Sequence, residues 1–143
     1  MASHHRTISR SVFDVLEKAR LDAVMYHNPY ITPEHVLFQM ESSGMLRDAM
    51  EKASMEPTFF RERLGFFLSF LSGTDSEASN TIRLSRPLCI ALEDAIDAAE
   101  REEDKTLTIF HLLWVISGLD NTLSGYLLRK HPEILDSFAA SPV

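Results

Sequence analysis

Few side chains in this 143-residue chain have the types and spacing that chemistry requires. Its six histidines and its one cysteine, Cys89, are the candidates for metal binding or nucleophilic attack. The adjacent His4 and His5 can bind a stray divalent metal, although a tag-like origin fits them better. Cys89 falls among apolar neighbours in an expected helix and lacks the sequence context of a nucleophile. Since a glycine-rich phosphate loop is also missing, nucleotide binding and hydrolysis are not expected.

Glu34 and His35 come nearest to a catalytic pair. The zinc-binding pattern needs two histidines one helical turn apart, and the sequence around Glu34 does not supply them. His111 holds the same third helical position in a second segment, which favours a packing or capping role for both histidines. A small metal-dependent hydrolase acting through His35 and Glu34 stays an alternative, which stoichiometric metal in the purified protein would support. Otherwise no cofactor and no metal are expected.

The two histidines belong to an internal duplication. Thr32-Pro33-Glu34-His35-Val36-Leu37 shares its frame with Thr108-Ile109-Phe110-His111-Leu112-Leu113, and 111 − 35 = 76. The same offset relates four upstream pairs, namely Val12 and Leu88, Leu16 and Leu92, Ala19 and Ala95, and Ala23 and Ala99. Each copy is therefore expected to have a first helix with an apolar stripe, a loop, and a threonine that opens a second helix.

The start of that second helix has residues suited to it. The hydroxyl of Thr32 can accept a hydrogen bond from an N–H of the first turn. Pro33 suits the first helical position, where its missing donor costs nothing. Glu34 would lie at the positive end of the helix dipole. We therefore expect Thr32 and Thr108 both to begin helices.

Hydrophobic periodicity and turn residues predict an all-α fold of eight helices in two pseudo-twofold-related four-helix repeats. The expected helices span about residues 9–26, 33–41, 45–53, 57–71, 85–103, 109–117, 121–130 and 132–138. Leu46, Ala49 and Met50 should face inward in the third helix. The predicted organisation is a tail at 1–8, repeat one at 9–71, a polar linker at 72–84, repeat two at 85–140 and the start of a linker at 141–143.

The fourth expected helix is apolar over more than half of its circumference, with many aromatic residues. One stripe contains Phe60, Leu64, Phe67 and Leu71, and a second contains Phe59, Phe66 and Phe70. A central helix packed by both repeats is the favoured interpretation. The alternative is an exposed aromatic patch, including Phe66 and Phe70, that binds a partner.

Composition limits the partners and the compartment. The formal charge of −7 disfavours nucleic acid and anionic membranes as partners. A single cysteine cannot form an internal disulfide, which fits a reducing compartment. The sequence has no apolar run long enough to span a membrane and no apolar signal-peptide core, so the cytoplasm is the expected location.

The duplicated frame, the Ile-Thr-Pro-Glu-His-Val-Leu entry to the second helix and Tyr126-Leu127-Leu128-Arg129-Lys130-His131 resemble the N-terminal domain of the Clp ATPases. The resemblance covers residues 9–138 and is nearest to the ClpA type. It implies a pair of four-helix repeats tethered by a linker to the ATPase ring of an unfoldase. Such a domain docks adaptors and substrates without catalysis, so this chain is expected to be a binding domain and not an enzyme.

The resemblance also implies partners and partner-binding residues. The expected partners are a Clp adaptor, unfolded or degron-bearing substrates, and the parent ATPase ring with its protease. Glu34 and Thr32 match the family motif on the partner-binding surface, and Phe66 and Phe70 join them if the aromatic patch is exposed. Versions that bind phosphorylated arginine have a second glutamate where this chain has Phe110, so the symmetric pair of carboxylates is missing and whether Phe110 abolishes that recognition stays open.

Two questions stay open at the level of sequence. The acidic run Glu100, Glu102, Glu103 and Asp104 is either a solvated helix end or a surface for a basic partner. The chain is either a domain of an unfoldase or a free-standing Clp-repeat protein that stabilises a Clp protease assembly. The downstream gene sequence separates these two, because Walker motifs would follow in the first case and a stop codon in the second.

Overall fold

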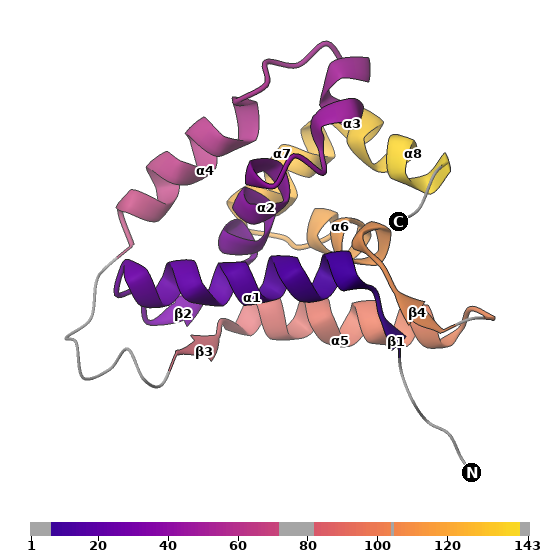
Figure 1. Cartoon of the computed structure of the whole chain (residues 1–143), viewed down its shortest axis with the longest axis horizontal. Helices are drawn as coiled ribbons and strands as arrows, with labels where there is room; N and C mark the ends of the chain where they lie inside the picture. Colours follow the sequence, from indigo (N-terminus) through magenta and orange to yellow (C-terminus); the bar gives the residue numbers. More distant parts are fainter. Residues whose placement is uncertain (1–6, 72–81, 104, 141–143) are drawn as a thin grey trace.

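A computed structural model describes residues 7–71, 82–103 and 105–140. Eight α-helices and four two-residue strands make up this part of the chain (Figure 1). The helices are α1 (Arg10–Met25), α2 (Pro33–Ser42), α3 (Arg47–Lys52), α4 (Phe59–Ser69), α5 (Arg86–Glu100), α6 (Ile109–Ser117), α7 (Leu123–Lys130) and α8 (Pro132–Ala140). The strands are β1 (Thr7–Ile8), β2 (Tyr30–Ile31), β3 (Arg83–Leu84) and β4 (Thr106–Leu107). The predicted all-α fold with eight helices is confirmed.

Helices α1 and α5 begin in the same way. The side chain of Ser9 accepts a hydrogen bond from Val12 N, and that of Ser85 accepts one from Leu88 N, both at 3.3 Å. The offset of 76 also relates the buried stripes, which are Val12, Val15, Ala19 and Ala23 in α1 and Leu88, Ala91, Ala95 and Ala99 in α5. The predicted stripes held Leu16 and Leu92 in place of Val15 and Ala91. Both leucines are only partly buried, because they lie at the edge of a buried stripe whose other three predicted members are confirmed.

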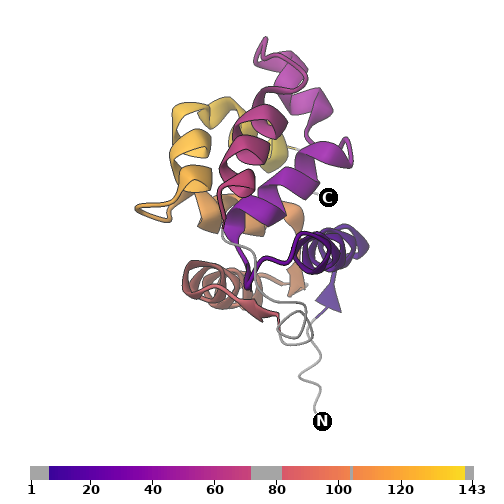
Figure 2. The same cartoon turned by 90° about the vertical axis from the view of Figure 1, so that its left-hand side faces the viewer.

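The layers follow the duplication. Helices α1 and α5 run antiparallel along the long axis, and the other six helices lie on one side of them (Figures 1 and 2). Helix α2 packs on α1, α4 and α7, while α6 packs on α5, α7 and α8. The repeats also exchange contacts, since α3 packs on α8 and α4 packs on α7.

This arrangement corrects the expected place of the aromatic helix. We expected α4 to be central, but α2 and α6 are the inner helices and α4 lies at one edge (Figure 1). Phe60 and Leu64 of α4 are fully buried, whereas Phe66 is 69% and Phe70 is 71% exposed. Phe67, expected in the core stripe, is only partly buried. The inward residues predicted for α3, Leu46, Ala49 and Met50, are all buried.

Two short parallel strand pairs connect the repeats, and the sequence did not predict them. Strand β1 pairs with β4, Ile8 facing Leu107, and β2 pairs with β3, Ile31 facing Leu84. The pairs are symmetry-equivalent, since 84 − 8 = 76 and 107 − 31 = 76. Ser9 N donates to Leu107 O at 3.0 Å and Ser85 N donates to Ile31 O at 2.9 Å, which extends each pair into the following helix.

The strands change the expected boundaries. Thr7 and Ile8 were assigned to the tail, and Arg83 and Leu84 to the linker, yet all four are paired strand residues. The remaining tail (1–6), the linker residues 72–81, Asp104 and residues 141–143 lie outside the described part of the chain. The division into two repeats at the linker stays a prediction. Across the residues described, the longest apolar stretch of any helix is too short to cross a membrane.

Candidate partner-docking site

The first turn of α2 is built around His35. Thr32 caps the helix, since its hydroxyl accepts a hydrogen bond from His35 N at 3.2 Å. The ring returns the contact, because His35 Nδ1 accepts the backbone N–H of Thr32 at 3.0 Å. The other ring nitrogen, Nε2, donates to Asn28 Oδ1 at 2.9 Å, which fixes the loop after α1. The histidine therefore takes the place that Glu or Gln holds in the usual capping box.

The second repeat uses its histidine in the same way. Thr108 begins α6, and His111 Nδ1 accepts the backbone N–H of Thr108 at 3.0 Å. His111 Nε2 lies 2.9 Å from Glu102 Oε2, a residue of the acidic run. One member of that run therefore serves the second repeat as Asn28 serves the first. The prediction that Thr32 and Thr108 both begin helices is confirmed, and of the packing or capping role predicted for the two histidines the structure shows capping.

Burial decides the protonation of His35, whose side chain is almost completely enclosed. Loss of solvent lowers the pKa of His35 to about 4, so the ring is neutral near pH 7. Both ring nitrogens are engaged, by Thr32 and by Asn28, which leaves no lone pair for a metal ion. No group of three His, Cys, Asp or Glu side chains with a metal-binding arrangement occurs among the described residues. This geometry does not support a hydrolase acting through His35 and Glu34.

Glu34 lies in a different environment from the one its motif predicted. Its side chain is only 4% exposed, and Oε2 accepts a hydrogen bond from Ser124 N at 3.0 Å. Ser124 is the second residue of α7, so the carboxylate of repeat one lies at the positive end of a helix in repeat two. A partner could reach this carboxylate only if Glu34 left Ser124. Direct partner contact by Glu34 stays a prediction, now in conflict with a buried position.

The equivalent place in repeat two holds Phe110, which packs partly buried against the core. Helix α3, the counterpart of α7, starts at Leu46 without a side-chain cap. The carboxylate junction between the repeats is therefore present on one side of the pseudo-twofold axis only. One buried carboxylate and one phenylalanine do not form the paired carboxylates that would grip two guanidinium groups.

The exposed aromatic patch considered from the sequence lies on the outer face of α4. The rings of Phe66 and Phe70 pack edge to face with centroids 4.9 Å apart. Phe59, the third member of the stripe, is instead partly buried under Arg63, whose guanidinium lies 3.7 Å from the ring centroid. Phe66 and Phe70 thus form the exposed aromatic pair, while Thr32 and Glu34 lie at the helix start beneath α4 and α7.

Sequence reasoning missed three residues that shape the surface and the junction. Asn28 and Ser124 were not singled out because each acts through a contact with a distant or buried polar group. Trp114, the single tryptophan, is 54% exposed on α6. A signal for Trp114 exists in the sequence, since α6 is apolar around its circumference and a nine-residue helix between two layers cannot bury every face.

Together, the fold and this site define a duplicated helical domain with a buried interrepeat junction and exposed aromatic side chains. The chain belongs to the Clp repeat N-terminal domain family, whose model matches residues 7–131. No curated protein sequence matches the chain.

Solved structures share the fold at low sequence identity. The N-terminal domain of Hsp104 from Candida albicans has a TM-score of 0.75 and 13% identity, covering 96% of this chain and 91% of that one. A structure described as a peptide from the EAEC T6SS Sci1 SciI protein has a TM-score of 0.69 and 19% identity, covering 91% and 89%. A structure whose description concerns the coevolution of the ATPase ClpV, the TssB–TssC sheath and the accessory HsiE protein in two type VI secretion classes has a TM-score of 0.69 and 16% identity, covering 98% and 92%. At these identities the likeness concerns the fold.

Proposed function

We propose that this chain is a non-catalytic docking domain of a Clp-type ATP-dependent unfoldase, which binds an adaptor or an unfolded or degron-bearing protein. The observation that carries the proposal is the exposed pair Phe66 and Phe70 beside a helix face that buries Phe60 and Leu64. Exposure of apolar side chains to water is unfavourable, and Phe66 and Phe70 are 69% and 71% exposed. Burial of these two rings by a partner would therefore favour binding. Aromatic residues are also enriched among the side chains that dominate binding energy.

Family membership and the fold relatives support the same function. Relatives of this fold include an Hsp104 domain and a structure described with a type VI secretion peptide, which is consistent with polypeptide binding. The finer ClpA assignment, the presence of a parent ATPase ring with its protease, and a cytoplasmic location belong to the proposal. The downstream gene sequence tests whether the chain is part of a longer unfoldase. A reading frame without Walker motifs would favour a free-standing Clp-repeat protein.

Thr32 and Glu34 act in this proposal by positioning. Helix α2, which they begin, packs directly on α4 and α7. The cap at Thr32 and the bond from Glu34 to Ser124 therefore hold the support on which Phe66 and Phe70 are displayed. Loss of the Thr32 cap or of the Glu34–Ser124 hydrogen bond should weaken binding by changing the orientation of α4, and not by removing a contact with the partner.

The test compares two surface changes of the same kind. A labelled, permanently unfolded substrate is titrated against the wild-type protein, against Phe66→Ser with Phe70→Ser, and against Phe13→Ser. Phe13 is the matched control, since it is 54% exposed on the outer side of α1. We expect about a tenfold or larger loss of affinity for the α4 variant, equal to 1.4 kcal/mol, and no change for Phe13→Ser. Equal affinity in all three proteins would contradict the proposal.

A further inference from the structure

A second surface, on repeat two, is hollowed more widely than its counterpart in repeat one, which α4 partly covers. A groove of about 650 Å³ runs between α5 and the end of α6 with the turn into α7. Its apolar part contains Ile90 and Trp114, which are 43% and 54% exposed. The turn is held firmly, because Arg129 Nη1 donates to Ser117 O and to Leu119 O, both at 2.9 Å. The groove therefore has a fixed wall and an exposed apolar floor.

The duplication shows what kind of element covers this position. Trp114, Val115 and Ala98 line the groove, and subtracting 76 gives Phe38, Gln39 and Asp22. These three residues line the equivalent hollow in repeat one, which keeps a volume of about 400 Å³ and is partly covered by the second half of α4. Gly65, Leu68, Ser69 and Leu71 supply that cover. Helix α4 packs on α2 here, and a Cβ added to Gly65 would lie 3.6 Å from the ring of Phe38, so the glycine lies directly over that ring.

Helix α8 does not cover the groove of repeat two in the same way. The buried pair Phe60 and Leu64 of α4 corresponds to Ile134 and Phe138 of α8, a difference of 74. None of the described residues of α8 lines the groove. Trp114 is exposed where Phe38 is packed under a helix.

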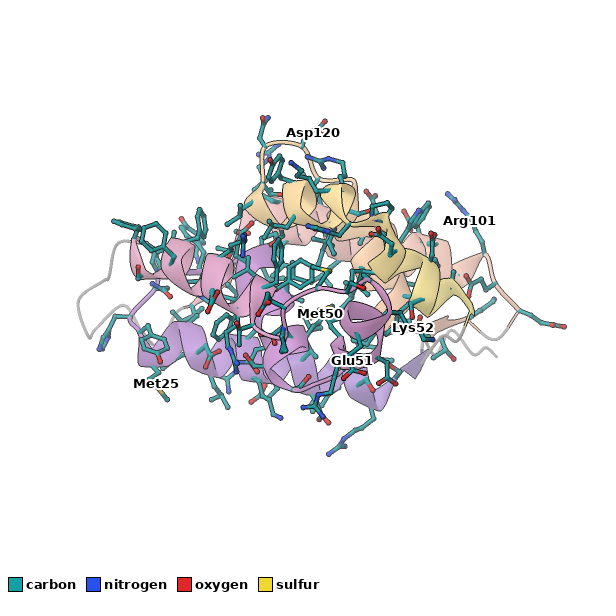
Figure 3. All side chains as sticks on the ribbon, turned by 90° about the horizontal axis from the view of Figure 1, so that it is seen from above. Met25, Met50, Glu51, Lys52, Arg101 and Asp120 are labelled. Carbon is teal, nitrogen blue, oxygen red and sulfur yellow. The ribbon has the colours of Figure 1, made fainter. Side chains whose placement is uncertain are left out.

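The charged residues that line the groove favour a partner of positive charge. Asp94 and Asp97 lie along the α5 wall one helical turn apart, and Asp120 lies on the opposite turn. Asp120 projects from the edge of the molecule in Figure 3. Arg86 and Arg101 stand near the two ends of α5, so the middle of the groove is acidic. An amphipathic helix with basic residues beside its apolar stripe complements this pattern.

We infer that the groove between α5 and α6 is a second docking site, which binds a basic amphipathic helix of a partner protein in the place that the second half of α4 takes in repeat one. This inference rests on the proposed docking function but uses a different surface from Phe66 and Phe70. Trp114 acts as the central apolar anchor. Asp94, Asp97 and Asp120 pair with the basic residues of the incoming helix.

Trp114 also reports on the site, because it is the only tryptophan of the chain. The probe is a synthetic peptide of about 16 residues, long enough to form a helix on binding, with leucines at i, i+3 and i+7 and lysines flanking that stripe. The control peptide has the same leucines, with glutamates in place of the lysines. The full-length chain is titrated with each peptide while Trp114 emission and the anisotropy of a label on the peptide are recorded. We expect the basic peptide to shift the emission to the blue and the acidic peptide to bind at least about tenfold more weakly.

Variants separate this site from the one on α4. Asp94→Asn with Asp97→Asn, and separately Trp114→Ala, should weaken the basic peptide about tenfold or more by anisotropy. Glu133→Gln with Asp136→Asn removes the same charge from exposed positions of α8 and should leave affinity unchanged. The Phe66→Ser, Phe70→Ser protein should also bind normally, and it would do so even if the proposed function failed at α4. Each variant is first checked for an unchanged melting temperature.

Several outcomes would overturn the inference. Equal binding of the basic and acidic peptides would remove the charge argument. Binding that leaves Trp114 emission unchanged, or that is lost in the Phe66→Ser, Phe70→Ser protein, would place the peptide elsewhere. A wild-type protein that sediments as a dimer, and that Trp114→Ala converts to a monomer, would identify a second copy of the chain as the occupant.

Discussion

The carboxylate of Glu34 accepts a hydrogen bond from the backbone N–H of Ser124 at 3.0 Å, across 90 residues of sequence. The bond lies at the N-terminus of α7, where a negative charge is favoured by the helix dipole. Thr122 caps the same helix, since its hydroxyl accepts the N–H of Gly125 at 3.0 Å. Two side chains from different repeats thus satisfy the first turn of α7. The junction is a strong structural constraint at the place where the family motif predicts a partner-binding residue.

Replacement of Glu34 should therefore affect stability before binding. Glu34→Ala leaves the buried N–H of Ser124 without an acceptor and should reduce the free energy of unfolding by about 1–3 kcal/mol. Glu34→Gln keeps an oxygen acceptor and should cost less. Urea denaturation of both variants measures the difference. A tenfold loss of substrate affinity in Glu34→Gln at unchanged stability would instead support direct contact between Glu34 and a partner. The affinity of Glu34→Gln should then also depend less on salt concentration than that of the wild type.

The two faces of α4 should respond differently to truncation. Phe60 is fully buried, so Phe60→Ala should reduce the free energy of unfolding by about 3–5 kcal/mol. Phe66 is 69% exposed, and Phe66→Ala should change it by no more than about 0.5 kcal/mol. Phe67, only partly buried, should fall between them. Chemical denaturation of the three variants is the measurement, and equal large losses for Phe60 and Phe66 would show that α4 is wholly buried in solution.

The threonine caps offer a matched comparison within one chain. Thr32→Ala removes a hydroxyl that accepts His35 N and should cost about 1 kcal/mol of stability. Thr108→Ala should cost less, because the hydroxyl of Thr108 lacks the side-chain cap hydrogen bond that Thr32 makes. Thr58 precedes α4 without a side-chain cap, so Thr58→Ala is the control and should be close to neutral. Indistinguishable urea midpoints for Thr32→Ala and Thr58→Ala would show that the cap contributes nothing measurable.

His35 should make the fold sensitive to mild acid. Its pKa is lowered by burial to about 4 in the folded protein, against about 6.5 in an unfolded chain. Between these values the unfolded state binds the proton and the folded state does not, so stability is fully present above pH 6.5 and is lost as the pH falls toward 4. From pH 7 to pH 5 the loss attributable to His35 should be about 2 kcal/mol.

The contribution of His35 is isolated by comparing wild type with His35→Gln at both pH values, because carboxylates titrate in the same range. Burial raises the pKa of Glu41, with Arg61 opposing the shift, so that residue acts with the opposite sign. The stability gap between wild type and His35→Gln should narrow at pH 5. A gap of constant size from pH 7 to pH 5 would mean that His35 does not titrate differently in the two states.

The sequence by itself determined the duplication, the eight helices and the helix starts. These features are local or periodic. A threonine caps the turn that follows it, and the helical spacing of small apolar residues can be recognised within one segment without knowledge of its neighbours in space. The offset of 76 was visible because both copies keep Thr32 and Thr108 in one register. Even there one member of each stripe was wrong, since Leu16 and Val15 are both apolar and only the direction of the neighbouring helix selects Val15.

Tertiary structure decided the rest. Two-residue strands such as Ile8 with Leu107 are too short to show alternation, and their hydrogen bonds depend on a partner about a hundred residues away. The place of α4 at an edge, and hence the exposure of Phe66 and Phe70, depends on which helices fill the interior. Glu34 looks like an exposed helix-start carboxylate in one repeat, and it becomes buried because the other repeat brings an uncapped N–H, that of Ser124, within 3.0 Å of it.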